Sequence, residues 1–425
     1  MKPQRYTSEH HCVRPSDLDP LARSVIERLA NNGFSAYLVG GGVRDMLLRK
    51  KPKDFDIATD ATPRAIKSLF RNSRIIGRRF KLAQVFFGRD KIFEVSTFRD
   101  MSPVIAEVIE DSSDQETITS PILDDNRFGT EETDALRRDI TINGLYFDPI
   151  SGTIIDYVGG IDDIRAKLIR IIGDPDIRIA EDPVRMIRVV RHAARSGFAI
   201  EPNTAESVLR NTALIHQSTD VRVFDEFKKD ILSGNFLKIA RLLGTMRLLE
   251  SLLPLVNTGI LEPQTPFSET VERVDDMVQS GEPIDLFVPL SLLALFSKAP
   301  DGGVGFGSIA ANREELDQYL NQFFGRMAVP RRERERVFAT IHLIRELFSD
   351  GLDGTFRGEQ WSPRALEDAE VVLRILPSSG HDRLVYRLLR DAHRAEAQGQ
   401  FTENSEQQRR PRRRNRHRRS RRESN

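Results

Sequence analysis

A glycine-rich turn followed closely by an Asp-x-Asp step constrains this chain more than any other feature. The apolar run 37–39 leads into three glycines and Arg44, and Asp54-Phe55-Asp56 follows a few residues later. Residues i and i+2 of a strand point to the same face, so Asp54 and Asp56 can present their carboxylates together. Such a pair can hold two hard cations ~3.5–4 Å apart, the arrangement used for in-line phosphoryl transfer. A surface turn beside an exposed strand would explain the glycines but not the acids.

The glycines and Arg44 predict a phosphate-binding turn. Gly40 and Gly41 have no side chain, so backbone N–H groups can come close to phosphate oxygens there. Arg44 lies near the start of a predicted helix and adds a fixed positive charge. Together with the acidic pair, this turn predicts phosphoryl-transfer chemistry.

A second cluster, Arg137-Arg138-Asp139, precedes a strand predicted over residues 140–147. Arg138 can pair with triphosphate oxygens as a planar donor fork, and Asp139 can supply a third active-site carboxylate. Glu94 competes for that role, because a charge inside an apolar strand is costly unless it is paired or bound to metal. A structural role stays open for both acids, as a salt bridge of Asp139 or a pair between Glu94 and Arg99.

A third cluster begins at Glu181-Asp182-Pro183. Pro183 predicts a helix start with Asp182 as its N-cap. Asp182 and Arg185 can offer an acceptor and donors to the edge of a base. Four arginines then follow at helical spacing on one face, which we predict to face phosphates: Arg185, Arg188, Arg191 and Arg195. The alternative is an ordinary amphipathic surface helix.

The composition narrows the class of protein. The 425 residues predict two or three domains with a large core. A single cysteine, Cys12, excludes a disulfide framework and a Cys-rich zinc site, and it fits a reducing cytoplasm. No apolar run approaches the ~20 residues of a membrane-spanning helix, so we expect no integral membrane segment.

The net charge is distributed very unevenly. Residues 409–425 contain ten arginines and one acid, which gives +9, so the other residues carry +1 − 9 = −8. This segment has nothing from which to build a core and is predicted to be a disordered tail. Its arginines predict binding to nucleic acid.

Strands and helices alternate over the first part of the chain, and helices dominate from about residue 177. Residues 101–135 are acid-rich and predict a mobile flap, and residues 236–253 predict one helix. The fold class is α+β, with a small mixed α/β head, an all-helical neck and body, and a disordered basic tail. The expected ranges are 1–20 for an N-terminal extension, 21–148 for the catalytic head, 149–216 for the neck, 217–400 for the helical body and 401–425 for the tail.

Five ordered motifs resemble those of the class II nucleotidyltransferases, the family of the bacterial CCA-adding enzymes and poly(A) polymerases. They are Gly40–Asp45, Asp54–Asp56, Arg137–Asp139, Asp156–Gly160 and Glu181–Arg185. The resemblance covers about residues 21–200. Residues 75–83, residues 125–129 and the arginine-rich tail look like the poly(A) polymerase version, although Gln84 stands where that version has a histidine.

The resemblance implies an enzyme that adds AMP from ATP to RNA 3′ ends with Mg²⁺. Asp54 and Asp56 would then hold the metal, and Asp139 would be an active-site acid. The nucleotide-binding residues that it implies are Gly41, Arg44, Arg138, Asp182, Arg185, Arg188 and Arg191, next to Gly40. Its partners would be RNA 3′ ends, ATP and, as a further candidate, the RNA-degradation machinery. Two alternatives stay open: a tRNA CCA- or A-adding enzyme, and a non-catalytic RNA-binding protein that keeps the fold.

Overall fold

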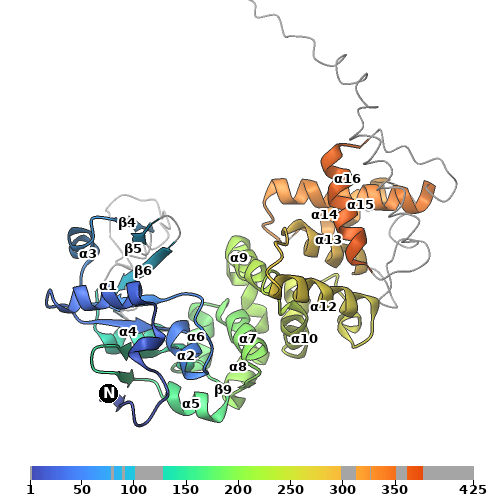
Figure 1. Ribbon diagram of the computed structural model, residues 1–425. Coiled ribbons are helices and arrows are strands. Elements are labelled where there is room, and N and C mark those ends of the chain that lie inside the picture. The colour runs from blue at the N-terminus through green and yellow to red at the C-terminus, as the bar shows by residue number, and fades with distance from the viewer. Residues whose placement is uncertain are drawn as a thin grey trace, which may run out of the picture. The chain divides into compact units, whose positions relative to one another are not determined.

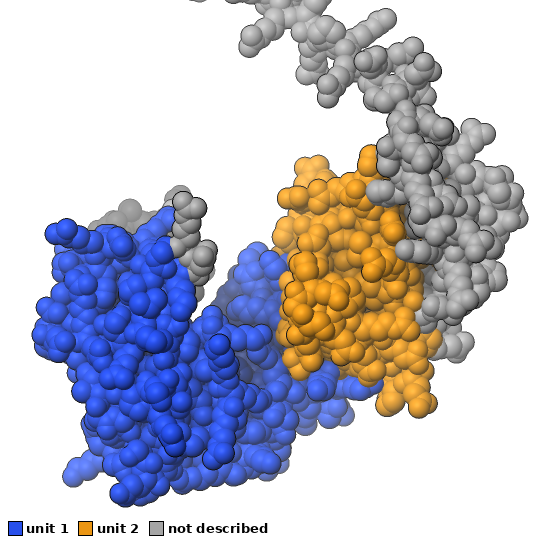
Figure 2. Space-filling view, viewed as in Figure 1, with its two compact units in different colours: residues 1–230, 238–253 blue, residues 231–237, 254–425 orange. Residues whose placement is uncertain are grey.

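The computed structural model describes residues 2–77, 81–88, 91–100, 128–297, 313–325, 327–350 and 361–376. The chain divides into two compact units, residues 1–230 with 238–253 and residues 231–237 with 254–425 (Figure 2). Most of the predicted flap (101–127), part of each poly(A)-polymerase-like segment (78–80 and 125–127) and the predicted tail lie outside the described residues.

The described part of the first unit contains a mixed eight-stranded sheet (Figure 1). The strand order is β1-β8-β7-β2-β3-β6-β5-β4. The strands are β1 Gln4–Tyr6, β2 Ala36–Val39, β3 Asp56–Thr59, β4 Ser73–Ile76, β5 Leu82–Phe87, β6 Lys91–Thr97, β7 Leu145–Asp148 and β8 Thr153–Asp156. Neighbouring strands pair antiparallel except β3 and β6, which run parallel.

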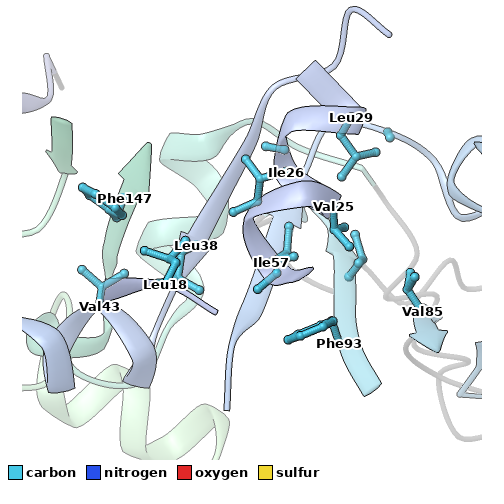
Figure 3. Packing of buried hydrophobic residues seen from close by; sticks show 14 of the residues in the cluster. Leu18, Val25, Ile26, Leu29, Leu38, Val43, Ile57, Val85, Phe93 and Phe147 are labelled. Atoms are coloured by element: carbon cyan, nitrogen blue, oxygen red, sulfur yellow. The ribbon is translucent and has the colours of Figure 1, made fainter. Parts of the chain in front are cut away.

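The main core of this unit lies between one face of the sheet and helix α1 (Pro20–Ala30). Because the apolar positions of α1 repeat with a helical period, Val25, Ile26 and Leu29 all become fully buried. They belong to the same buried cluster as Leu38 of β2 and Ile57 of β3 (Figure 3). Helices α2 (Gly41–Leu47) and α3 (Pro63–Leu69) add side chains to this cluster.

A smaller cluster covers the opposite face of the sheet. Val39 of β2 and Ala58 of β3 belong to it, as the two-residue period of a strand requires when its neighbours Leu38 and Ile57 face the main core. Helix α4 (Glu131–Arg137) contributes Ala135 to this second cluster. Both faces of the sheet are therefore covered at β2, β3 and β7. Strands β4 and β6 keep exposed positions along their length, Arg74 and Ile75 in β4 and Ile92 and Glu94 in β6.

Helices make up most of the remaining described chain. They are α5 Gly160–Ala166, α6 Pro175–Glu181, α7 Arg185–Ser196, α8 Pro202–Asn211, α9 Asp220–Ile231, α10 Phe236–Thr245, α11 Leu249–Leu252, α12 Pro266–Gln279, α13 Phe287–Phe296, α14 Arg313–Phe323, α15 Arg331–Asp350 and α16 Pro363–Ile375. In the second unit α13 is buried along its whole length. Among the described residues, no helix is long and apolar enough to span a membrane.

The predicted fold class is confirmed, with some differences in detail. Strand β1, from the expected N-terminal extension, pairs with β8 at the edge of the sheet. The neck range is not all-helical, because it contains β8 and the short parallel pair β9 (Leu168–Ile169) and β10 (Ala199–Ile200). Its first residues therefore continue the sheet of the head.

Three local predictions were wrong. The helix expected over 236–253 is split into α10 and α11, because Arg247 adopts a left-handed backbone with φ of 57°. The strand expected over 140–147 is interrupted after Ile140 by a 3-10 turn at Thr141–Asn143, and a strand forms only at β7. The end of the predicted flap is helical, since α4 starts at Glu131 with Thr130 as its N-cap.

Candidate active site

The structure places the Asp-x-Asp pair at the start of β3. Asp56 is the first residue of the strand, Asp54 lies just before it, and both are exposed. Phe55 between them turns toward the core, where its ring meets that of Phe93 edge-on with 6.5 Å between centroids. The two acids therefore point away from the core, as predicted.

Glu94 lies next to this pair rather than inside the core. Ile57 of β3 pairs with Val95 of β6, so the preceding residues, Asp56 and Glu94, are neighbours across the two parallel strands. Glu94 is exposed and accepts a hydrogen bond of 3.1 Å from Gln84 Nε2. Gln84, which departs from the poly(A) polymerase version, thus holds the third acid of the cluster.

The charges around Asp56 are not balanced. Partial desolvation is the largest factor that raises its pKa, and the negative charges of Glu94 and Asp54 raise it further, while Arg138 opposes them. Such crowded carboxylates suit a hard cation, which would remove their repulsion. No group of three or more His, Cys, Asp or Glu side chains in the described ranges could hold a metal ion by itself. Mg²⁺ usually takes one or two protein carboxylates and fills its other positions with water and substrate phosphates, so the residues fit.

The glycine-rich turn lies beside the acids. Gly40 has φ of 70°, and a Cβ at this position would lie 3.2 Å from Arg138 Nη1. A Cβ on Gly42 would lie 3.2 Å from the backbone oxygen of Asp54. A side chain at either glycine would push the turn away from the residues that the site requires.

Arg44 of the turn and the neighbouring Arg138 are both held in place. Arg44 donates to Asp45 Oδ1 (2.7 Å from Nη2) and to Asn143 Oδ1 (2.8 Å from Nη1). Arg138 donates to Asp134 Oδ2 (3.1 Å), and its guanidinium lies 5.4 Å from the ring centre of Tyr146. Desolvation acts to lower the pKa of Arg138, but Tyr146 and Asp134 outweigh it and raise the pKa, so this residue stays charged.

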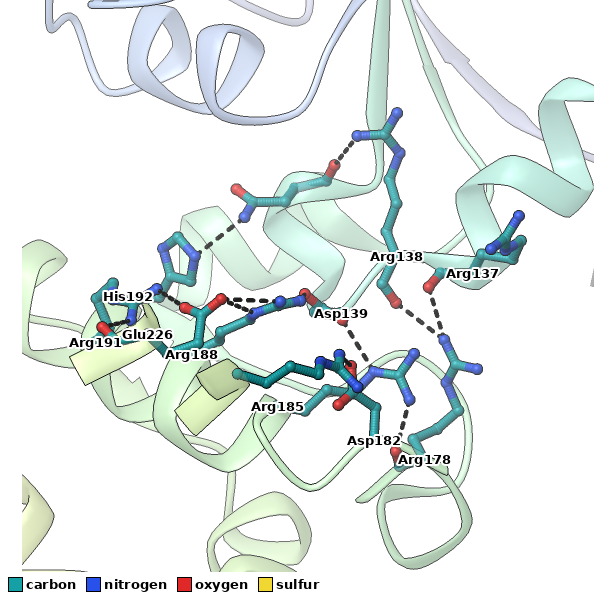
Figure 4. A network of polar contacts seen from close by, with 12 residues as sticks. Arg137, Arg138, Asp139, Arg178, Asp182, Arg185, Arg188, Arg191, His192 and Glu226 are labelled. Atoms are coloured by element: carbon teal, nitrogen blue, oxygen red, sulfur yellow. Dashed lines mark hydrogen bonds and ion pairs between the residues drawn. The ribbon is translucent and has the colours of Figure 1, made fainter. Parts of the chain in front are cut away.

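Asp139 binds two arginines of α7 (Figure 4). Arg185 Nε lies 2.9 Å from Oδ1, and Arg188 Nη1 lies 2.7 Å from Oδ2. Burial would raise the pKa of Asp139, but Arg188 and Arg185 more than offset it and lower the pKa. The salt bridge considered for Asp139 is therefore present, and its role as an active-site acid stays a prediction. Glu94, and not Asp139, is among the charges that act on Asp56.

Three of the four arginines of the predicted α7 stripe, Arg185, Arg188 and Arg191, are paired with acids, whereas Arg195 is exposed. Arg188 Nη2 lies 3.0 Å from Oε1 of Glu226, and Arg191 pairs with both Glu226 and Asp230. All three guanidinium nitrogens of Arg191 already donate to Glu226 and Asp230, so the structure does not offer them to phosphates.

Glu226 and Asp230 both come from α9 and are spaced four residues apart on the face that also buries Phe227 and Ile231. Acids on the apolar face of an amphipathic helix are the signal that could have revealed this contact. Burial raises the pKa of Asp230 to about 6 despite its arginine partner.

Asp182 is not the N-cap that the sequence predicted. It ends α6, while α7 begins at Arg185 with Val184 as its N-cap. Its Oδ2 accepts from Arg222 at 2.9 Å, but its Oδ1 is buried and has no partner. Because an unpaired buried acceptor is costly, Oδ1 is the atom most suited to a donor on a ligand. The backbone N–H of Arg185 bonds the carbonyl of Asp182 at 3.0 Å, so the two predicted base-reading residues are adjacent.

Comparison with known proteins agrees with this geometry. The family model described as "Poly A polymerase head domain" matches residues 36–170, and "Probable RNA and SrmB- binding site of polymerase A" matches residues 197–260. Poly(A) polymerase I of Escherichia coli O6:H1 is 43% identical over 267 residues, covering 63% of this chain and 57% of the relative. Poly(A) polymerase I of Haemophilus influenzae is 37% identical over 353 residues, covering 78% of this chain and 76% of the relative.

More distant relatives share the fold. The CCA-adding enzyme of Bacillus pumilus is 36% identical over 229 residues, which cover 54% of each chain. A crystal structure of a tRNA nucleotidyltransferase with a primer tRNA and an incoming ATP analog gives a TM-score of 0.58 at 23% identity, covering 88% of this chain and 99% of that one. The chain spans 54–57% of the length of the Escherichia coli and Salmonella poly(A) polymerases that it matches. It belongs to the nucleotidyltransferase family of the bacterial poly(A) polymerases and CCA-adding enzymes.

Proposed function

We propose that this chain adds AMP units from ATP to RNA 3′ ends without a template. The observation that carries the proposal is the cluster of Asp54, Asp56 and Glu94, which lies beside the glycine turn and the fixed cation Arg138. Negative groups that need a cation, next to positive groups that need an anion, match a metal-bound triphosphate.

Each residue of the site would do one part of this reaction. When bound, Mg²⁺ would favour the deprotonated RNA 3′-hydroxyl and neutralise the leaving pyrophosphate. Asp54 and Asp56 would hold the metal, with Glu94 close enough to support them. The turn at Gly40 and Gly41 would bind the triphosphate, and Arg44 and Arg138 would stabilise its negative charge.

The base would be read by Asp182 and Arg185. The carboxylate of Asp182 can accept from an amino group of the base, and Arg185 can donate to a ring nitrogen beside it. Adenine and cytosine present this order of an amino donor next to a ring-nitrogen acceptor. Guanine and uracil present the reverse order and would leave the buried Oδ1 of Asp182 unpaired, which disfavours them. The choice of ATP over CTP is supported by the higher identity to poly(A) polymerases than to CCA-adding enzymes.

Labelled nucleotides test the proposal directly. The protein is incubated with ATP or CTP and with two RNAs, a generic oligomer and a tRNA that lacks its 3′ end. We expect long ladders from ATP on the generic oligomer. Short products that require CTP and form on the tRNA alone would instead identify a CCA-adding enzyme, and no transfer to either RNA would identify a non-catalytic RNA-binding protein.

The roles of Glu94 and Asp139 can be separated by a magnesium titration. For Glu94→Ala we expect the Mg²⁺ concentration at half-maximal activity to rise by about tenfold, because the carboxylate supports the metal ligands. For Asp139→Ala we expect an unchanged Mg²⁺ requirement and a lower thermal midpoint, because Arg185 and Arg188 each lose one of their acidic partners. The opposite pattern would make Asp139 the third metal-site acid.

The predicted tail would increase the affinity for RNA without taking part in the chemistry. The logarithm of the RNA-binding constant falls with the logarithm of the salt concentration, and each phosphate contact contributes roughly −0.7 to that slope. If about half of the ten arginines in residues 409–425 contact phosphates, deletion should make the slope less steep by about 3. Single AMP additions at saturating RNA should stay nearly unchanged. RNA affinity is measured against salt for the full and shortened chains, and equal slopes would show that the tail does not bind RNA.

We also propose a cytoplasmic location and cooperation with RNA-degradation enzymes, which consume 3′ tails.

A further inference from the structure

A groove of about 740 Å³ lies in the first unit and is lined by none of the residues assigned above to the nucleotide. It is lined by parts of two segments, residues 8–17 and residues 46–52, and we call it the α2 groove because the second segment contains the end of α2. Lys51 precedes Asp54 by three residues, a length of chain that spans at most about 10 Å. The groove is therefore close to the catalytic carboxylates without containing them.

The α2 groove is strongly basic. Four of its lining residues are cations, Arg14, Arg49, Lys50 and Lys51, whereas Asp17 is its only acid. Asp17 accepts a 2.8 Å hydrogen bond from the backbone N–H of Arg14. None of the four cations forms an ion pair with another described residue, unlike Arg185, Arg188 and Arg191 of α7.

The local structure accounts for only part of this charge. Cations near the end of α2 would complement the negative end of the helix dipole, which explains residues 49–51. It does not explain Arg14, which comes from a separate segment. Outside residues 409–425 the chain has an excess of eight negative charges. Four unpaired cations around one groove are therefore opposite in sign to the net charge of the rest of the chain.

Both walls of the groove are anchored. The Sγ of Cys12 lies 3.5 Å from the carbonyl of Leu47 at the end of α2. The ring of His11 meets that of Phe147 in β7 edge-on, with centroids 6.2 Å apart. The preceding residues form β1 in the main sheet. The cations are therefore carried by a preformed surface and not by a loose terminus.

We propose that the α2 groove binds backbone phosphates of the RNA strand just upstream of its 3′ end. The inference rests on the proposed function, since the 3′-hydroxyl must then reach Asp54 and Asp56. Upstream phosphates would pass within reach of Lys51, and unpaired lysines and arginines bind phosphates without reading sequence. Such a contact suits an enzyme that extends many different RNA ends.

Cys12 provides a direct test, because it lines the groove and is the only cysteine in the chain. The rate of its alkylation by N-ethylmaleimide is measured on the full chain without ATP, with and without a single-stranded oligoadenylate. At an RNA concentration about ten times Kd we expect alkylation to slow by about tenfold. An unchanged rate under saturating RNA would overturn the proposal.

Matched charge reversals provide the second readout. Lys50→Glu/Lys51→Glu removes two groove cations, while Arg64→Glu/Arg74→Glu makes the same charge change at exposed, unpaired positions of α3 and β4. In the groove variant we expect RNA no longer to slow the alkylation of Cys12, compared with the rate for the same variant without RNA. We also expect the log–log slope of its RNA affinity against salt to be less steep by about 1.4. The control variant should change neither, and equal behaviour of the two variants would refute the groove.

Neither readout depends on catalysis, so the two proposals can fail separately. AMP transfer without protection of Cys12 would reject the groove and leave the proposed function standing. Protection of Cys12 without transfer would keep the groove and reject the proposed function. Thermal melting of each variant shows whether it is folded, and the alkylation rate of the unmodified chain tests the groove even if a variant does not fold.

Discussion

Replacing either Asp54 or Asp56 with alanine is expected to abolish AMP transfer. The two carboxylates lie exposed at the start of β3, and the neighbouring Glu94 comes from β6 and is bonded to Gln84. Loss of a metal ligand removes several kcal/mol of transition-state stabilisation. A residual rate of no more than about 1%, equivalent to roughly 2.7 kcal/mol, is therefore expected at saturating ATP and RNA.

The same variants should keep their fold and their RNA affinity. Neither side chain belongs to a hydrophobic cluster, and replacing an exposed carboxylate removes no core contact. Asp162→Ala is a suitable control, because Asp162 is an exposed acid in a surface pair with Arg165. Activity well above about 1% in either variant, with the control at full activity, would contradict a metal-binding role for that residue.

Glu226→Gln is expected to give the largest loss of stability among the site residues. Glu226 is 4% exposed and pairs with Arg188, Arg191 and Lys229. Burial would raise its pKa, but Arg188 and Arg191 dominate and lower the pKa to about 2 from the ordinary 4.5. That shift corresponds to about 3 kcal/mol, or a fall of about 6–12 °C in the midpoint of the first unit. Differential scanning calorimetry measures it.

The pH dependence of this difference has a definite sign. A carboxylate with a lowered pKa stabilises the folded state fully above its unfolded value of 4.5 and loses that contribution as the pH falls toward about 2. The midpoint gap between the unmodified chain and Glu226→Gln should therefore be constant near neutral pH and shrink below pH 4.5. Lys229→Gln, which removes a 61% exposed partner, should lower the midpoint only slightly. A gap that widens in acid would contradict the ion-pair network.

The catalytic pair and the phosphate-binding turn could be predicted because their geometry is local. The spacing of Asp54 and Asp56 sets which face they share, and Phe55 packs toward the core as its position between them requires. The positive φ of Gly40 is available mainly to glycine, so the turn could also be predicted from the local sequence. Helix starts such as Thr62 before α3 follow from capping by neighbouring residues.

Only the tertiary structure decided which of the other charged residues remain available to a ligand. Arg191 looked like a phosphate-binding residue until α9 supplied Glu226 and Asp230, which lie 35 and 39 residues further along the chain. In the sequence, Glu94 and Asp139 were equal candidates for the third carboxylate. The parallel pairing of β3 with β6 brings Glu94 next to Asp56, while two arginines of α7 form ion pairs with Asp139. The sequence determines which charges exist and which face they share within one element. Their partners depend on contacts between distant elements, because an ion pair forms only where folding brings opposite charges together at low dielectric.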